Sequence, residues 1–481
     1  MSEGPRRASA APIGVRERYR AALESLYRRR RFGLKPGLEV EEALLRALGE
    51  PQRSFPSLHV TGSKGKGSVA TLSAAILAGH GLRTALFTSP HLTSYRERLK
   101  IDDREASRQE VVDGLARVEA LAEQLLAEGQ IDRPPTFFEV TTALAFDWFA
   151  RRGTQAAVVE VGLGGRLDAT NLLDARVGVL TTIELEHTEI LGPTLEAIAL
   201  EKAGILHPGM LGVVGKLPGP AATAVLRVAD RLGVPLWRLG VELGASDRRL
   251  DADGQSLTLR FPGLTLKGVR LPLLGTFQAD NAVLAVAAAA RFLEGIGRRL
   301  DPAATLEALA TVRIPGRMQR LARAPELLYD VAHTPESARA VAMSVAEIAP
   351  LSDPAGSTVV FGCLQGKRVE TILDALSPLA RTLVIVPVRS ERAMDTGLIR
   401  VAAVGRFPRV VLARSAGEGL ALARAATAPD GVTLVTGSDY LVGELLRGNA
   451  SEDEPDLSDP GTSVASVAAA PGPSGPGRRG P

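Results

Sequence analysis

Short apolar runs alternate with longer stretches of helical periodicity from Ser57 to about Leu293. The runs, rich in β-forming residues, span 57–62, 84–89, 156–163 and 177–183. Between them lie helical stretches at 68–80, 108–128 and 137–152. Strands that alternate with helices form βαβ units, whose parallel sheet is covered by helices on both faces. The pattern therefore predicts an α/β fold with a mostly parallel sheet.

The segment 235–274 has a different pattern. Its alternation is shorter, and turn signals occur at Asp253-Gly254 and Pro262-Gly263. Apolar alternation around such turns is typical of antiparallel hairpins. We therefore expect hairpin-like strands over this segment and helix over 281–310.

A second α/β stretch runs from about 313 to 449. Its predicted strands are 326–332, 357–362, 382–388, 409–413 and 432–437. We place the boundary between the two units near 296–312, a segment that contains Gly297 and Pro302.

The two ends of the chain differ from the rest. Residues 1–15 are predicted to be a loose tail, and the Arg-rich residues 16–49 to form one or two amphipathic helices. Residues 450–481 are rich in Ser, Pro, Gly, Ala and acidic residues. Such a segment buries too little apolar area to fold, so we expect a disordered tail.

Composition narrows the class of protein. Apolar residues make up 45% of the 481 residues, and 57 Lys plus Arg nearly balance 54 Asp plus Glu. That balance indicates a globular protein and gives little support to nucleic-acid binding. No apolar run approaches the ~18 residues of a membrane span, and no secretion signal precedes residue 15. One cysteine, Cys363, fits a reducing compartment, so we expect a cytoplasmic protein with a buried thiol.

The strongest local signal is the segment Gly62-Ser63-Lys64-Gly65-Lys66-Gly67-Ser68. It follows an apolar strand and precedes a helical run, which is the context of a phosphate-binding loop. Glycines let backbone N–H groups close around phosphate oxygens, and the helix N-terminus adds partial positive charge. Lys66 can reach the β and γ phosphates, and Ser68 is expected to open the helix. The common pattern GxxxxGK[ST] does not fit, so an ordinary glycine-rich turn stays open.

Three side chains able to bind a metal ion lie at or just beyond the C-terminal ends of predicted strands. They are Ser89, Glu160 and His187. Ligands of open α/β sheets bind at this edge. Glu160 lies in the apolar run 156–163, where a carboxylate needs a partner or a metal ion.

The loop GSKGKGS resembles the GTNGKGS loop of the folylpolyglutamate synthase and dihydrofolate synthase family, a branch of the Mur ligases. Similar blocks follow in family order; they are 84–102, 136–146, 158–171, 181–206, 275–285, 315–321, 329–338 and 435–446. The resemblance implies a Mur-ligase-type ATP-binding domain over 16–300, with a mostly parallel P-loop ATPase sheet. It also implies a smaller, Rossmann-like C-terminal ligase domain over 313–449.

The resemblance implies an activity as well. Such an enzyme uses ATP and Mg²⁺ to phosphorylate the carboxylate of dihydropteroate or of a folate. The amine of L-glutamate then attacks the acyl phosphate, and ADP and phosphate are released. The partners would be these small molecules, without nucleic acid or membrane, and members of the family are often monomers.

The matching motifs also imply roles for individual residues of the site. The resemblance implies that residues 62–68 bind ATP together with Asn281, Arg317, Asp330 and His333. Ser89 and Glu160 would hold one Mg²⁺, and His187 would contribute to a second. Lys66 and Arg317 would offset charge on the transferring phosphoryl group. Lys202 matches a lysine that is carbamylated in many such ligases, Asp168 matches a residue that binds the pterin ring, and Phe137 and Phe138 would offer a stacking face.

Plainer interpretations stay open for these residues. His187 could cap a helix or lie in the core, and Lys202 could be a surface lysine paired with Glu201 or Glu196. Asp168 could form an Asx turn or an N-cap. Phe137 could be a core aromatic, and Arg317 a linker residue.

The sequence departs from the family pattern at a few positions, which are Ser63-Lys64, Glu186, Phe277, Thr334 and Gly366-Lys367-Arg368. Three rivals remain: a Mur-type ligase for another carboxylate, a P-loop ATPase or GTPase switch, and a nucleotide-binding protein that has lost catalysis. The departures at Thr334 and Gly366 keep the last of these open. Whether the first glutamate, later ones or both are added is also open, although Asp168 within LDATN favours the first.

Overall fold

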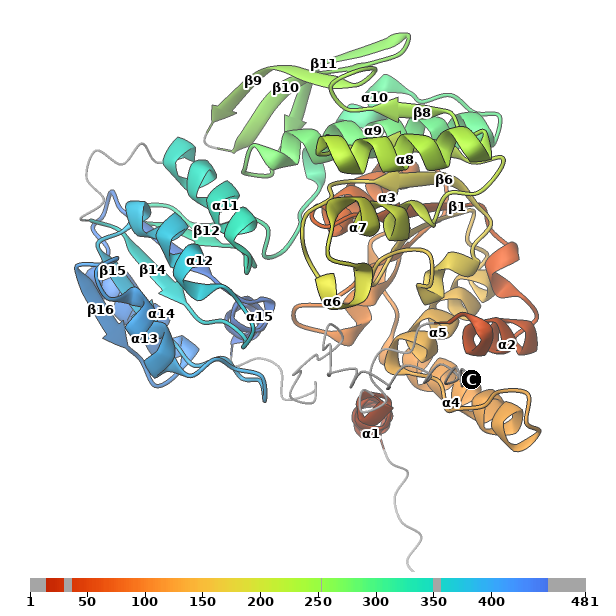
Figure 1. The fold of residues 1–481 in the computed structure, drawn as a ribbon, viewed down its shortest axis with the longest axis horizontal. Helices are drawn as coiled ribbons and strands as arrows, with labels where there is room; N and C mark the ends of the chain where they lie inside the picture. Colours follow the sequence, from red (N-terminus) through yellow and green to blue (C-terminus); the bar gives the residue numbers. More distant parts are fainter. Residues whose placement is uncertain (1–13, 30–36, 252, 349–355, 449–481) are drawn as a thin grey trace, which may run out of the picture.

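The computed structural model describes residues 14–29, 37–251, 253–348 and 356–448. The chain forms two lobes (Figure 1). The first holds an eight-stranded and a three-stranded sheet, and the second holds a six-stranded sheet. The tails predicted at 1–15 and 450–481 lie outside the described residues, except that helix α1 already begins at Val15.

The eight-stranded sheet has the order β4-β3-β2-β5-β1-β6-β7-β8. Six strands are parallel: β1 Ser57–Thr61, β2 Thr84–Phe87, β5 Ala156–Glu160, β6 Ala175–Leu180, β7 Leu211–Val214 and β8 Leu236–Arg238. Two short antiparallel strands, β3 Leu99–Ile101 and β4 Arg104–Glu105, form one edge. The predicted α/β fold is confirmed.

Helices cover both faces of this sheet because β1, β2 and β5 are buried along their whole length. Helices α3 Lys66–Gly79 and α9 Phe277–Gly295 pack together on one face. The other face carries α1 Val15–Arg28, α2 Glu39–Ala47, α4 Arg108–Ala127, α5 Phe137–Arg151, α7 Leu195–Ala203 and α8 Gly219–Leu232.

The segment 235–274 is only partly antiparallel. Strands β9 Gly244–Asp251, β10 Gly254–Phe261 and β11 Leu264–Leu271 form the predicted antiparallel sheet. The first residues instead form β8, which pairs in parallel with β7. The helix expected over 281–310 is likewise two helices. Helix α9 ends at Gly295, and α10 Pro302–Thr311 begins anew after Asp301, whose side chain accepts a bond from the Ala303 N–H.

The second lobe has the strand order β12-β13-β17-β14-β15-β16. Its strands are β12 Gln319–Ala322, β13 Glu326–Tyr329, β14 Thr358–Phe361, β15 Thr382–Ile385, β16 Arg409–Leu412 and β17 Val432–Thr436. All pairs are parallel except β12 with β13, and β12 was not predicted. Helices α11 Pro335–Ile348, α12 Val369–Leu376 and α13 Thr396–Ala403 pack on one face, and α14 Ala416–Ala426 and α15 Asp439–Arg447 on the other.

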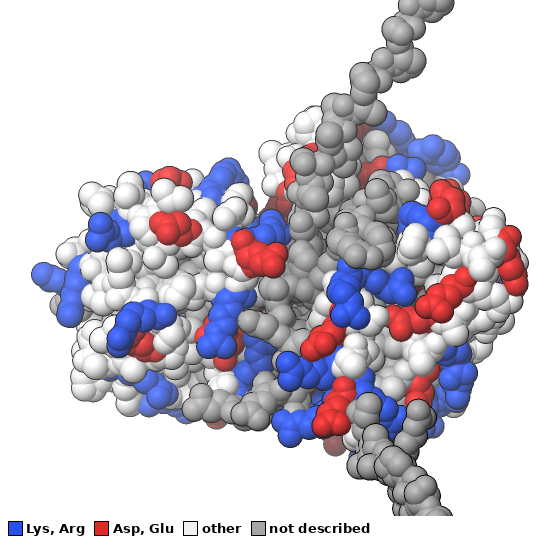
Figure 2. All heavy atoms as spheres, turned by 90° about the horizontal axis from the view of Figure 1, so that it is seen from below, with Lys and Arg blue, Asp and Glu red and all other residues white. Residues whose placement is uncertain are grey.

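Two further expectations concern burial and surface. Cys363 is fully buried in the core of the second lobe, as predicted. Within the described ranges, no helix is long and apolar enough to cross a membrane. On the face shown in Figure 2, basic and acidic side chains are interspersed.

The core around α5 gives a stability prediction. Phe146 on α5 is fully buried and packs edge-on against Phe55. Phe146→Ala should lower the free energy of unfolding by about 3–5 kcal/mol, because the large cavity cannot collapse fully. Urea unfolding followed by circular dichroism would measure this loss. The control Leu200→Ala, on the solvent side of α7, should change it by less than about 0.5 kcal/mol. Equal losses in both variants would contradict the assigned core.

Candidate active site

The phosphate loop connects β1 to α3 and needs its glycines. Gly62 and Gly65 have φ of 145° and 86°, which side chains disfavour. A Cβ on Gly62 would lie 1.9 Å from the Thr181 Oγ1, and one on Gly67 would lie 3.4 Å from the Glu160 Oε2. The sequence had predicted that Ser68 opens the helix, but the helix begins two residues earlier, at Lys66. The loop therefore presents a helix N-terminus next to a buried carboxylate, which suits phosphate oxygens and a cation.

The cations of the loop are already engaged. Lys66 Nζ donates to the carbonyl oxygens of Gly62 (3.0 Å) and Ser63 (3.4 Å). Lys64 Nζ forms an ion pair with Glu186 at 3.2 Å. Both ammonium groups thus lie at the mouth of the loop, where they can exchange protein oxygens for phosphate oxygens.

Lys202 comes to the same loop from α7. Its side chain is buried, and its Nζ donates to the Gly62 carbonyl oxygen at 2.9 Å and pairs with the Glu186 Oε1 at 3.5 Å. Burial, together with the nearby Lys66, lowers the pKa of Lys202 to about 8. The interpretation as a surface lysine is wrong, because Glu201 and Glu196 pair instead with Arg166 and Arg227.

Glu186 is the anion that holds these lysines together. Burial disfavours its charge, but Lys64, Lys66 and Lys202 outweigh burial and keep its pKa well below the usual value. Glu186 replaces the family's aspartate before His187. The longer side chain reaches two lysines at once.

Two of the predicted metal ligands lie directly beside the loop. Glu160 ends β5, is buried, and accepts a hydrogen bond at Oε2 from the Ser89 N–H at 3.0 Å. Burial raises the pKa of Glu160, against the effect of Lys66. A buried carboxylate with a neighbouring serine fits Mg²⁺, which uses one or two carboxylates and completes its shell with water and phosphate oxygens.

His187 lies at the start of the short helix α6 Thr188–Leu191, with a left-handed φ of 48°. Its side chain does not cap that helix, which contradicts the capping interpretation. Burial lowers its pKa despite Glu186, so the ring is a neutral potential ligand. No group of three or more His, Cys, Asp and Glu side chains within the described ranges is placed to hold a metal by itself.

The second half of the predicted nucleotide site faces the loop. Asn281 on α9 lies so close to Gly65 that a Cβ there would be 2.6 Å from the Asn281 Oδ1. Arg317 acts electrostatically on both Glu160 and Asp330. Asp330 accepts the N–H groups of Met318 and Ala332 at 2.8 Å each, and burial, opposed by Arg317, raises its pKa to about 6.

His333 and Lys367 extend this face. Burial lowers the pKa of His333, and the charges of Lys64 and Lys367 add to that effect. Burial also lowers the pKa of Lys367, which lies near Lys64 and Arg392. Lys367 had been noted only as a departure from the family pattern. The signal that could have revealed it is its place after β14, at the carboxyl edge of the sheet.

The two lobes meet beside the metal ligands. Leu92, three residues after Ser89, packs against α15, where a Cβ on Gly443 would lie 2.2 Å from the Leu92 carbonyl oxygen. The Leu92 side chain also lies 2.9 Å from the position of a Cβ on Gly316. The loop that carries Ser89 is therefore in direct contact with the second lobe.

Asp168 makes a cap within its own loop. Its Oδ1 accepts bonds from the Thr170 N–H (3.1 Å) and Oγ1 (2.5 Å), and its Oδ2 accepts one from the Leu163 N–H (2.8 Å). The Gly162 N–H adds a further bond. The carboxylate thus caps the 3₁₀ turn Ala169–Leu172, and its role toward a pterin stays a prediction.

Phe137 is packed on both sides. Tyr27 stacks on it with ring centres 5.6 Å apart, and the Arg98 guanidinium lies 5.2 Å from its centre. Phe138 is only half-buried and lies over Gly162, where a Cβ would be 2.5 Å from the ring. Phe138 therefore offers a more accessible stacking face than Phe137.

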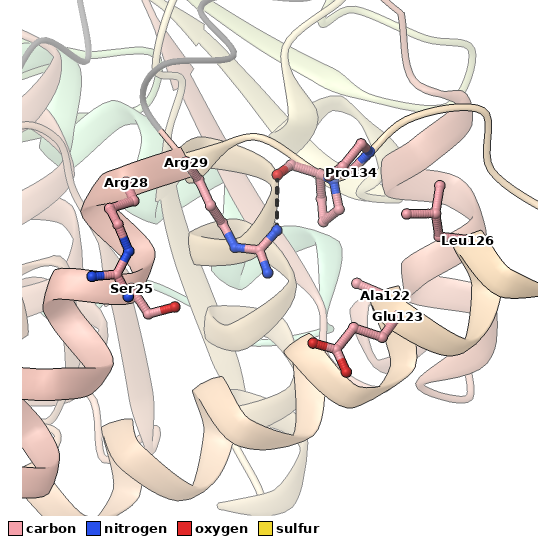
Figure 3. Close-up of a pocket in the computed structure, with 8 residues that line it drawn as sticks. Ser25, Arg28, Arg29, Ala122, Glu123, Leu126 and Pro134 are labelled. Carbon is pink, nitrogen blue, oxygen red and sulfur yellow. Dashed lines mark hydrogen bonds between the residues drawn. The ribbon is translucent and has the colours of Figure 1, made fainter.

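A hollow of about 270 Å³ lies elsewhere, between α1, α4 and the loop before α5 (Figure 3). Its lining residues are Ser25, Arg28, Arg29, Ala122, Glu123, Leu126, Pro134 and Pro135. Arg29 donates to the Pro135 carbonyl oxygen at 3.4 Å and pairs with Glu119 at 3.5 Å. None of the predicted site residues lines this hollow, so the candidate site remains at the phosphate loop.

Known proteins with similar sequences were found by comparison. Residues 60–289 match the Mur ligase middle domain, and residues 316–439 match the Mur ligase glutamate ligase domain. The dihydrofolate synthase/folylpolyglutamate synthase of Mycobacterium tuberculosis is 36% identical over 386 residues, which cover 78% of this chain and 79% of that protein. The folylpolyglutamate synthase of Lacticaseibacillus casei is 33% identical and covers 84% of this chain and 92% of its own.

A solved structure agrees with these sequence matches. Mycobacterium tuberculosis folylpolyglutamate synthase complexed with ADP superposes with a TM-score of 0.82 at 34% identity, covering 89% of this chain and 98% of that one. The two Mur ligase regions and the matches in sequence and structure, which cover most of the chain, support the same assignment. The chain belongs to the dihydrofolate synthase/folylpolyglutamate synthase family of Mur ligases.

Proposed function

We propose that this protein is an ADP-forming ligase that uses ATP to join L-glutamate to dihydropteroate, to a folate, or to both. The observation that carries the proposal is the meeting of Lys66, Lys202 and Glu160 around one glycine-rich loop. The names of the relatives support the substrates, since one names both activities and another names only folylpolyglutamate synthase. Asp168 within LDATN favours dihydropteroate as one acceptor.

In the first step, the substrate carboxylate attacks the γ-phosphorus of ATP, and the bond to the β-phosphate oxygen breaks. The N–H groups of residues 62–68 hold the phosphates, and Lys66 and Arg317 offset the charge that spreads over the transferring group. Asn281, Asp330 and His333 complete the nucleotide site. Ser89 and Glu160 would hold one Mg²⁺ and His187 would contribute to a second, and these ions would add charge neutralisation and alignment of the phosphates.

In the second step, the α-amine of glutamate attacks the acyl phosphate. The C–N bond forms, the bond between the acyl carbon and the phosphate oxygen breaks so that phosphate leaves, and the nitrogen loses a proton. Contact of the two lobes at Leu92 and Gly443 excludes water from the labile intermediate. Water exclusion matters because hydrolysis of the acyl phosphate would waste the ATP.

The carboxylates of glutamate need cations in the second lobe. Lys367 lies near Lys64 and Arg392, and the acids Asp439 and Glu186 offset part of this positive charge. Among the described residues, the side chains of Lys367 and Arg392 form no hydrogen bond or ion pair. Two like charges held together in this way favour an anion between them. We infer that they bind the carboxylates of the incoming glutamate.

Lys202 is proposed to carry a carbamate. Carbamylation requires a neutral amine, and the pKa of Lys202 is already lowered to about 8 by burial. The product is an anion close to Lys66, Lys64 and the metal ligands. It would help to position Mg²⁺ in place of a third protein carboxylate.

The protein is further inferred to act as a monomer in the cytoplasm. Its single cysteine is buried and unpaired, which fits a reducing compartment. All its substrates are small and soluble molecules, so the activity requires neither a membrane nor nucleic acid.

The proposed activity is tested by ADP release with Mg²⁺-ATP, L-glutamate and bicarbonate. Dihydropteroate is offered in one reaction and tetrahydrofolate in another. We expect glutamate-dependent turnover with dihydropteroate; turnover with both would show a bifunctional enzyme. ATP hydrolysis that ignores glutamate and pteridine would favour an ATPase switch, and silence in both reactions would reject the folate assignment.

Replacing Lys202 tests the carbamate. Lys202→Ala should lower kcat on the order of 10²–10³-fold, because a charge that positions the metal is lost. A short carboxylic acid added to the assay should restore part of the rate. Lys202→Arg keeps the positive charge but cannot be carbamylated, so it should stay as slow as Lys202→Ala. Full activity in Lys202→Arg would show that the cation, not a carbamate, is required.

Replacing Lys367 tests the glutamate site. A charge-assisted hydrogen bond contributes about 1.5–3 kcal/mol, so Lys367→Ala should raise the KM for glutamate roughly 10- to 100-fold. The KM for ATP should change little. Arg368→Ala is the matched control, because its exposed side chain pairs with Glu336. A rise in the KM for ATP alone would assign Lys367 to the nucleotide instead.

A further inference from the structure

The central strand of the first lobe carries a buried histidine that none of the steps above uses. His59 lies on β1, which runs between β5 and β6, and its side chain is buried. Its neighbours along the strand, Leu58 and Val60, are fully buried apolar residues. A polar ring at such a position is costly unless it is hydrogen-bonded. The partner of His59 therefore indicates what the ring does there.

His59 is hydrogen-bonded to the turn that contains Asp168. The His59 Nε2 lies 2.8 Å from the Thr170 Oγ1, and this Oγ1 lies 2.5 Å from the Asp168 Oδ1. All three side chains are buried. They form a continuous chain of hydrogen bonds from β1 to the carboxylate.

The direction of this chain follows from its protons. Burial raises the pKa of Asp168, but hydrogen bonds from Thr170, Leu163 and Gly162 oppose that effect and favour the carboxylate. The Thr170 hydroxyl has one proton, which it donates to the carboxylate. Its oxygen therefore accepts from His59, whose proton is assigned to Nε2. Burial lowers the pKa of His59 to about 3, so the ring is neutral and this N–H is its single donor.

A second side chain of β1 binds the same loop. Thr61 lies two residues after the histidine, on the same face of the strand. Its Oγ1 donates to the Gly164 carbonyl oxygen at 2.6 Å. Gly164 belongs to the loop between Glu160 and Asp168. The strand thus holds this loop at two points and then continues directly into the phosphate loop at Gly62.

The two ends of the proposed site are therefore attached to one strand. The phosphate loop follows β1, and Asp168 is joined to β1 through Thr170 and His59. The substrate must reach both, since its carboxylate reacts at the γ-phosphate of ATP while its pteridine lies at Asp168. A displacement of about 1 Å in a positioning group can cost about 10²-fold in rate. The bonds that fix Asp168 to the strand thus bear on how the substrate is aligned.

We propose that His59 is a positioning residue for the pteridine end of the substrate, and that it acts through Thr170 to fix the plane of the Asp168 carboxylate. This inference rests on the proposed function, which places the pteridine at Asp168. A ring N–H of the pteridine shares or replaces one of the backbone N–H groups that this carboxylate accepts. Because Oδ1 is held by both bonds from Thr170, the carboxylate is oriented before the ring arrives, which lowers the ordering cost of binding.

Removing the donor tests this role. His59→Leu should raise the KM for dihydropteroate about tenfold, because the hydroxyl that binds the carboxylate loses its own donor. The KM for ATP should not change. His59→Gln keeps an N–H at a similar reach and should restore most of the affinity. The matched control is His80→Leu, which removes a buried histidine that binds the Ile76 carbonyl oxygen and the Asp301 N–H. This control should melt at a lower temperature with an unchanged KM for dihydropteroate.

The other members of the chain supply independent variants. Thr170→Val should raise the KM for dihydropteroate as His59→Leu does, whereas Thr170→Ser keeps the hydroxyl and should resemble wild type. In the Asp168→Ala background, His59→Leu should cause no further rise, because residues that act through one another are not additive. If His59→Leu does not fold, the two Thr170 variants decide by the same criterion.

Three results would overturn the inference. One is an unchanged KM for dihydropteroate in His59→Leu. Another is an equal rise in the KM values for dihydropteroate, ATP and glutamate, which would show a general structural role. The third is an undiminished effect of His59→Leu in the Asp168→Ala background, because His59 would then not act through the carboxylate.

Equilibrium binding of dihydropteroate, followed by ring fluorescence without ATP or glutamate, separates this inference from the proposed function. Binding to wild type that His59→Leu weakens, without any turnover, would support the role of His59 and reject the ligase activity. Normal turnover with equal binding to both proteins would reject the role of His59 alone. Absence of binding to wild type would reject both.

Discussion

Two ammonium groups, those of Lys66 and Lys202, donate to the same oxygen, the carbonyl of Gly62. This convergence is the constraint on which the site depends. It requires that Gly62 has no side chain, since a Cβ would overlap the Thr181 hydroxyl, and it requires an anion nearby to offset the repulsion of the cations. Glu186 is that anion. The loop is thus held open and positively charged before any nucleotide arrives, which reduces the reorganisation needed at the moment of reaction.

The second lobe adds further charged side chains to the site at the phosphate loop. Across the boundary between the lobes, the charge of Arg317 acts to lower the pKa of Glu160, and the charge of Lys64 acts to lower the pKa of Lys367. The contact of Leu92 with α15 joins the loop of Ser89 to this lobe. The residues that we propose for phosphoryl transfer and amide formation therefore come from both lobes, so the two lobes must lie together for the reaction.

Much of the fold could be predicted from the chain because its signals are local. Short runs rich in apolar and β-forming residues, such as 57–62 and 156–163, predict a sheet buried on both faces, and the spacing of glycines predicts the phosphate loop. Strands β8 and β12 were missed or misplaced because three or four residues carry too little periodicity, and their pairing depends on distant neighbours. The break between α9 and α10 occurs at Gly297 and the Asp301 cap. Gly297 had been used to place the boundary between the two units, but not to divide the helix expected over 281–310.

The chain by itself determined which chemical groups are present and where they stand relative to each strand. Lys66, Ser89 and Glu160 follow strands, so their meeting at one sheet edge could be inferred from parallel topology. Only the tertiary structure decided how the groups are used. Lys202 is 140 residues from Gly62, and its burial on that carbonyl depends on how α7 packs. Asp168 accepts hydrogen bonds from its own loop, whereas Glu41 is buried and has no hydrogen-bond partner among the described residues. Burial and hydrogen-bond satisfaction are properties of packed layers, which is why residue type and spacing cannot specify them.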